Sequence, residues 1–174
     1  EIPFIAAPDN SIDSSNLPTF NFEVTADVTD INGETRSTTT HVAVGYHSLN
    51  VTLQVPEFFD KTKKDNKINI ASTNLNGEFA ATTGEVTLYK LQAPNHVLRP
   101  RPWAAPDYSG FTKKEFKELY PHDAFKNEND PSQWEKEKVI WSSNFNTAES
   151  KEIAFGKTKN WKSGKYRLEL SVKD

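Results

Sequence analysis

Apolar and polar residues alternate along residues 20–28. The apolar positions are Phe20, Phe22, Val24, Ala26 and Val28. A period of two places these side chains on one face, which predicts a β-strand with one buried face. The pair Asn32 and Gly33 supplies the positive φ angles of a tight turn, so it predicts a hairpin with its second strand at residues 37–45. In residues 1–19, the apolar start at Ile2, Phe4 and Ile5 predicts one strand, and the turn-rich stretch after it predicts a loop.

Six more short segments resemble strands, most of them by the same alternation. They are residues 50–55, 67–73, 85–91, 138–143, 151–155 and 165–172. Turn-forming pairs separate some of them, for example Asn76 with Gly77 and Ser163 with Gly164. Short strands at turn-marked intervals predict an all-β fold, an antiparallel β-sandwich.

A proline-rich insertion at residues 94–138 interrupts this pattern. It holds six of the ten prolines: Pro94, Pro100, Pro102, Pro106, Pro121 and Pro131. One short helix is predicted inside it, because Thr112 and Glu115 have the spacing of a capping box. An apolar face follows at helical spacing, formed by Phe116, Leu119 and Tyr120. Pro121 then ends the predicted helix.

The pattern predicts two units along the chain. Residues 1–48 hold too few strands for a sandwich, and we interpret them as the C-terminal strands of a preceding β-module. Residues 49–174 predict a β-sandwich domain that contains the insertion at 94–138.

Composition is typical of a globular chain without disulfides. The 174 residues are 35% hydrophobic and 26% charged, which is enough apolar material for a sandwich core. A formal net charge of -3 argues against a nucleic-acid partner. No apolar run approaches the length of a membrane span, so we expect no direct membrane insertion by this segment. Without cysteine, the chain has no disulfide, thiol nucleophile or cysteine-ligated zinc.

The candidate chemical groups form no known catalytic or metal-binding pattern. The histidines are His41, His47, His96 and His122, and they share no ligand spacing. A second polar group surrounds the predicted hairpin turn: Asp27, Asp30, Asn32 and Glu34. Its spacing departs from that of a calcium loop after Asn32. The common nucleophile, zinc-protease and phosphate-loop motifs are absent from the sequence. We therefore expect no enzyme activity, no metal and no cofactor.

Large aromatic side chains in the insertion are the candidate contact surface. They are Trp103, Phe111, Tyr120 and Trp134. In one interpretation the rings hold the insertion against the sandwich and dock a neighbouring module. In the other, exposed rings bind glycan or peptide by stacking. Two coplanar tryptophans facing solvent would favour a glycan, and buried rings would favour the scaffold.

Two segments carry a resemblance to a known family. Residues 22–36 resemble the penultimate hairpin of a macroglobulin domain, the repeated β-sandwich of the alpha-2-macroglobulin family, and residues 161–170 resemble the same place in the next repeat. The whole chain, including the run Pro121, His122 and Asp123, is most similar to the large macroglobulin-like proteins of Bacteroidetes bacteria.

This resemblance implies seven-stranded fibronectin-like modules in series and a periplasmic or cell-surface location. It implies that the parent protein inhibits proteases by entrapment, and that this chain is a non-catalytic scaffold. The implied partners are neighbouring modules of the same polypeptide and, through the full-length protein, proteases. Family members often carry a Cys–Gln thioester, which this cysteine-free chain cannot hold. The alternative function is an extracellular module that binds glycan or peptide through the aromatic insertion.

Overall fold

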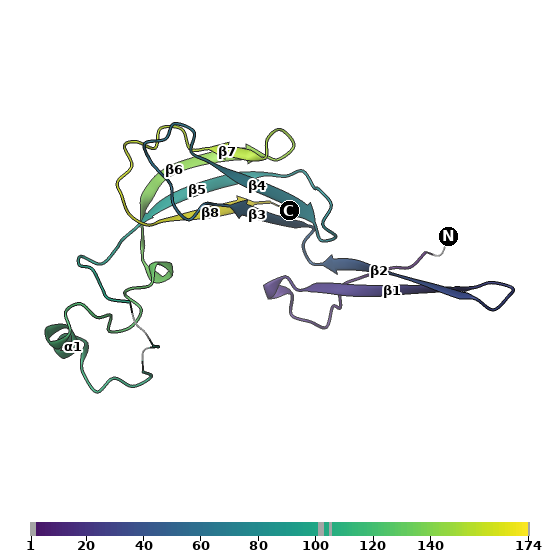
Figure 1. The fold of residues 1–174 in the computed structure, drawn as a ribbon, viewed down its shortest axis with the longest axis horizontal. Helices are drawn as coiled ribbons and strands as arrows, with labels where there is room; N and C mark the ends of the chain where they lie inside the picture. The colour runs from purple at the N-terminus through teal and green to yellow at the C-terminus, as the bar shows by residue number, and fades with distance from the viewer. Residues whose placement is uncertain (1–2, 101–102, 105, 174) are drawn as a thin grey trace.

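Two three-stranded antiparallel sheets form the centre of the molecule in a computed structural model, which describes residues 3–100, 103–104 and 106–173 (Figure 1). The first sheet has the order β3-β4-β7, with bounds Leu49–Gln54, Lys67–Asn74 and Glu152–Ala154. The second has the order β6-β5-β8, with bounds Lys136–Asn146, Thr83–Leu91 and Tyr166–Val172. The predicted all-β, antiparallel sandwich is confirmed, and each of the six predicted segments contains a strand.

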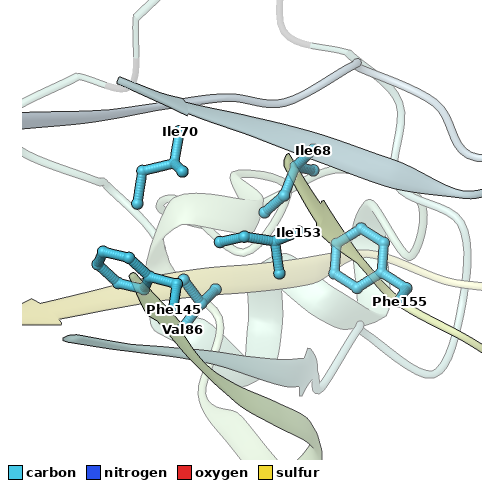
Figure 2. Close-up of a cluster of buried hydrophobic side chains, with 6 residues drawn as sticks. All are labelled: Ile68, Ile70, Val86, Phe145, Ile153 and Phe155. Atoms are coloured by element: carbon cyan, nitrogen blue, oxygen red, sulfur yellow. The ribbon is translucent and has the colours of Figure 1, made fainter. Parts of the chain in front are cut away.

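The hydrophobic core lies between these two sheets (Figure 2). Ile68 and Ile70 of β4 are 1% and 2% exposed, because the alternation in this strand turns both side chains to the same face. Val86 of β5 faces them from the other sheet and is fully buried. The rest of the buried cluster is Phe145, Ile153 and Phe155.

A separate two-stranded ribbon extends from the sandwich (Figure 1). It consists of β1 (Thr19–Thr29) and β2 (Thr35–Gly45), which pair antiparallel along their whole length. The predicted hairpin is therefore confirmed, but its turn differs from the expected two-residue turn. Gly33 has φ of 84° whereas Asn32 does not have positive φ, and the loop runs from Asp30 to Glu34, closed by a hydrogen bond from Asp30 N to Glu34 O at 2.9 Å.

The strand predicted within residues 1–19 is wrong for residues 3–18, which form turns and a short 3-10 helix at Ser14–Asn16. Phe4 and Ile5, where the strand was expected, are 51% and 94% exposed and pair with no strand of the described residues, so no buried face stabilises a strand there. The stretch expected to be a loop does form turns, in which the carboxylates of Asp9 and Asp13 accept from the backbone N–H of Ser11 and Ser15. Glu1 and Ile2, the start of the predicted strand, lie outside the described residues.

The insertion leaves the sandwich at the end opposite the ribbon (Figure 1). It covers residues 92–135, because β5 ends at Leu91 and β6 begins at Lys136, two residues before the predicted resumption of strand at 138. We call residues 92–135 the lobe. The lobe holds α1 (Lys113–Leu119) and a 3-10 turn at Pro131–Gln133. The predicted helix and its capping box between Thr112 and Glu115 are confirmed.

Candidate functional site

An aromatic cluster organises the lobe around α1. The helical spacing places Phe116 and Tyr120 on one face, and their ring centroids are 5.1 Å apart. Phe111 meets Tyr120 edge-on at 6.2 Å, and Phe125 meets Phe116 at 5.4 Å. Such T-shaped pairs are the favoured geometry for aromatic rings. The lobe thus has an aromatic centre of its own.

The four predicted contact residues do not form one site. Phe111 and Tyr120 lie together in the aromatic cluster and are 43% and 42% exposed. Trp134 is half-buried and donates its Nε1 hydrogen to the backbone oxygen of Glu128 at 2.9 Å. Trp103 is 74% exposed. The two tryptophans therefore sit in different environments, one anchored and one facing solvent.

Contacts of the aromatic rings within the described residues hold the lobe together internally. A polar contact links the lobe to the sandwich, because the guanidinium of Arg167 on β8 donates to Ser132 O. At the base of the lobe, Gln92 N donates to Glu135 O at 2.9 Å and holds its two ends together. The interpretation that the aromatic side chains hold the lobe against the sandwich gains no support from these contacts.

An open cavity of about 650 Å³ lies between the base of the lobe and α1. Its wall combines the aromatic rings of Phe125 and Trp134 with polar and charged groups, among them His96, Lys113, Lys117, Asp123 and Glu128. A wall of this kind suits a ligand that has both flat apolar parts and several polar groups.

Ion pairs fix the acidic side chains of this wall. Arg99 binds Asp123 through two parallel hydrogen bonds of 2.8 and 2.9 Å, the geometry that a guanidinium and a carboxylate favour. Lys113 lies 3.7 Å from Glu128. Partial burial raises the pKa of Glu128, but backbone N–H donors and the charges of Lys113 and Lys117 together outweigh it and lower the pKa below its ordinary value. The Glu128 carboxylate is therefore charged at neutral pH.

Two of the acidic side chains in the cavity wall are paired with cations, Asp123 with Arg99 and Glu128 with Lys113. Among the residues that the structure describes, no group of three or more His, Asp and Glu side chains could hold a metal ion.

Sequence reasoning missed two residue pairs of this site. Phe116 and Phe125 belong to the aromatic cluster, although only Phe111 and Tyr120 among its rings were selected as contact residues. The ion pair between Arg99 and Asp123 joins the lobe segment before α1 to the segment after it. The helical spacing of Phe116 was a usable signal, whereas nothing in the sequence predicts a pairing across 24 residues.

Comparison with protein-family models, with curated proteins and with solved structures finds no match to this chain. In the described part of the chain, no helix is both long enough and apolar enough to cross a membrane.

Proposed function

We propose that this chain is a non-catalytic structural segment of a protein built from β-sandwich modules in series. Residues 49–172 form one sandwich, and the ribbon β1–β2 supplies two strands to a neighbouring module. The observation that carries the proposal is an apolar ribbon face that stays exposed over much of its length, at Phe22, Ala26 and Val28.

Cross-strand pairing defines this face. Residues directly opposite each other in an antiparallel pair share a face, and the register pairs Phe20 with Val44 and Phe22 with Val42. The face continues along β1 through Val24, Ala26 and Val28. Phe22 is 37% exposed and Val28 is 68% exposed. A two-stranded hairpin alone is at best marginally stable in water, so we expect a sheet of the neighbouring module to cover this face.

A second observation supports modules of one kind in series. If β3 to β8 are taken in order as strands A, B, C, C′, E and F of a fibronectin-like module, the sheets have the orders A-B-E and C′-C-F. The last strand, G, would pair with the outer edge of β8, which has no partner strand among the described residues. The ribbon has the form of the F–G hairpin of such a module.

The junction supports a scaffold role because it fixes the ribbon relative to the sandwich. Asn76, in the turn between β4 and β5, binds both backbone groups of Ala43 on β2, with distances of 2.8 and 3.3 Å. Tyr46 packs edge-on against Phe20 at 6.1 Å and donates to the backbone oxygen of Asp9. A module that positions its neighbours needs a connection of this kind.

At the level of the parent protein, we extend the proposal to a bacterial alpha-2-macroglobulin-like protein of the periplasm or cell surface, with this segment as scaffold for protease entrapment. The support is the sequence resemblance of residues 22–36 and 161–170. Mass spectrometry of the intact parent after methylamine treatment tests for a covalent trap: an adduct supports a thioester outside this cysteine-free chain, and no adduct removes the covalent form of the proposal.

Hydrogen exchange tests the structural proposal directly. We expect the ribbon amides at residues 22–42, beyond the part that Asn76 holds at Ala43, to exchange fast in the isolated chain and slowly in the parent protein, because only there is the apolar face covered. The amides of β4 and β5 should be protected in both and serve as the internal control. Equal protection of the ribbon in both proteins would show that it needs no cover, and the proposal would fail.

A binding function is the second candidate, favoured by exposed aromatic rings on the lobe. Trp103 and Tyr108 are 74% and 86% exposed. Exposed flat rings are suited to stacking on sugars or on side chains of a peptide. Titration with a panel of soluble oligosaccharides and short peptides tests this function: binding lost in Trp103→Ala and kept in Val97→Ala, a variant at another exposed lobe residue, supports it. No binding by the unmodified chain argues against it.

A further inference from the structure

Two turns of this chain share one sequence pattern and one geometry. Residues 30–34 read Asp-Ile-Asn-Gly-Glu, and residues 74–78 read Asn-Leu-Asn-Gly-Glu. In each turn the first side chain accepts from the backbone N–H of the third and fifth residues, at 2.8–3.0 Å. Gly33 and Gly77 both have φ of 84°. The two loops are therefore built alike.

The second turn is docked on a strand. The side-chain amide of Asn76 accepts from Ala43 N at 2.8 Å and donates to Ala43 O at 3.3 Å, so it pairs with β2 as another strand would. The half-buried Leu75 lies beside Gly45, where a Cβ would come within 3.1 Å of Leu75 Cδ1. A glycine at this position of β2 thus makes room for the leucine.

The first turn has the same two groups without a strand to receive them. Ile31 is 102% exposed, the position that Leu75 fills in the docked turn. Asn32 occupies the position of Asn76, and its side chain makes no hydrogen bond within the described residues. The turn lies at the tip of the ribbon, at the end far from the sandwich (Figure 1). A fully exposed isoleucine beside a free amide has the properties of a contact residue.

The outer edge of β2, on which the second turn docks, offers backbone groups and little else. Because Ala43 gives both its N–H and its C=O to Asn76, these groups point away from β1 and belong to the outer edge of the ribbon. An unpaired strand edge offers such a pair of groups at every second residue. A small residue followed two positions later by glycine, as Ala43 and Gly45 are, completes the site.

We propose that the ribbon tip is a docking element for the outer edge of a β-strand in the preceding module. Ile31 packs beside a glycine and Asn32 pairs with the backbone of a small residue, as Leu75 and Asn76 do on β2. The proposal rests on the proposed arrangement of modules in series. In that series each Asn-Gly turn binds the last strand of the module before it, and repeated docking of this kind sets the orientation of successive modules.

The first test asks whether the tip sequence can dock. In Asn74→Asp/Leu75→Ile the docked turn has the tip sequence, and we expect the Ala43 amide to exchange as slowly as in the unmodified chain. Asn76→Ala is the reference for loss, with exchange about tenfold faster because one hydrogen bond is removed. If the Ala43 amide in the swapped variant exchanges as fast as in Asn76→Ala, the tip sequence cannot dock and the proposal is overturned.

The second test asks whether the tip docks on another copy. A ¹⁵N-labelled Leu75→Ala/Asn76→Ala chain offers the uncovered edge of β2. It is mixed with unlabelled chain of natural sequence, which supplies the ribbon tip and is called the donor. We expect concentration-dependent shifts of the Ala43, Val44 and Gly45 amides, and no shift with an Ile31→Ser/Asn32→Ala donor. Equal shifts with both donors, or none with either, overturn the proposal. Neither result depends on whether the apolar ribbon face is covered, so failure here is distinguishable from failure of the proposed function.

Discussion

Asn66 donates a hydrogen bond from Nδ2 to Oγ1 of Thr158 at 2.9 Å, across 92 residues of sequence. Both side chains are buried, at 7% and 3% exposure. The same Nδ2 reaches the backbone oxygens of Asp60 and Lys63, and the Thr158 hydroxyl donates to Lys61 O at 3.0 Å. One polar group therefore ties the loop between β3 and β4 to the segment between β7 and β8.

We predict that Asn66→Ala lowers the free energy of unfolding by about 2–3 kcal/mol, because buried carbonyl and hydroxyl groups lose their donor. Urea unfolding followed by tryptophan fluorescence measures this change. Asn50→Ala, at an exposed position on β3, is the matched control and should change stability by less than about 0.5 kcal/mol. Similar losses in both variants would contradict the role assigned to Asn66.

Gly84→Ala should destabilise the sandwich because the added methyl group has no space. A Cβ at Gly84 would lie 2.3 Å from the backbone oxygen of Ser171 and 2.9 Å from the ring of Phe145. We expect the free energy of unfolding to fall by about 1–3 kcal/mol, measured by thermal or urea unfolding. Gly110→Ala in the lobe is the control, since a Cβ there meets nothing within 4 Å. A fully stable Gly84→Ala chain would show that β5 and β8 are not packed as described.

Acid should loosen the start of α1 before the sandwich unfolds. The hydroxyl and the backbone N–H of Thr112 donate to the Glu115 carboxylate, which lowers its pKa below the ordinary value of 4.5. A lowered pKa in the folded state means that the stabilisation is complete above pH 4.5 and is lost as the pH falls through the lower, folded value. The Thr112 amide shift in an NMR pH series measures this loss. Glu115→Gln should remove the pH dependence, and an unchanged titration in that variant would exclude Glu115 as its source.

Trp134 and Trp103 should respond differently to replacement by phenylalanine. Trp134→Phe keeps a ring but removes the hydrogen bond to Glu128 O, so we expect the lobe to lose about 1 kcal/mol of local stability. Trp103→Phe should leave stability unchanged because the side chain is 74% exposed. Exchange rates of lobe amides measure both effects. A larger effect at position 103 would contradict the anchoring role of Trp134.

The two faces of β1 should differ in tolerance to a polar residue within the parent protein. Val24 lies on the apolar face and Thr25 on the opposite, polar face. We predict that Val24→Asn destabilises the parent by about 1–3 kcal/mol because a buried amide would lack partners, and that Thr25→Asn changes stability little. Thermal unfolding of the parent measures the difference. Equal tolerance at both positions would mean that the ribbon face is not buried there.

The strands of the sandwich could be predicted from the sequence because they depend on local alternation. The pattern of β4 turns Ile68 and Ile70 inward whatever their partners are. The capping box of α1 is equally local, since Thr112 and Glu115 need only each other. The strand expected at Phe4 and Ile5 does not form, because a strand needs a partner and a covered face that the local sequence does not supply, and both side chains are exposed.

The candidate site could be predicted only in part. The sequence selected the lobe and four of its aromatic rings, but exposure decides between an anchor and a contact residue, and exposure depends on neighbours distant in sequence. Trp103 and Trp134 are the same residue type, yet within the described residues Trp134 alone of the two donates to a backbone acceptor, Glu128 O. Likewise, the two Asn-Gly turns have nearly one sequence, and packing against β2 alone distinguishes Asn76 from Asn32.

The sequence by itself determined the strand periodicity, the helix with its cap, the presence of an insertion, and the absence of cysteine chemistry. Each of these follows from bonds and side chains a few residues apart. Only the tertiary structure decided that the lobe and the ribbon occupy opposite ends of the sandwich, that Asn66 joins two loops, and that much of one apolar ribbon face is exposed. These features arise from contacts between segments far apart in the chain, and no local pattern encodes which segments meet.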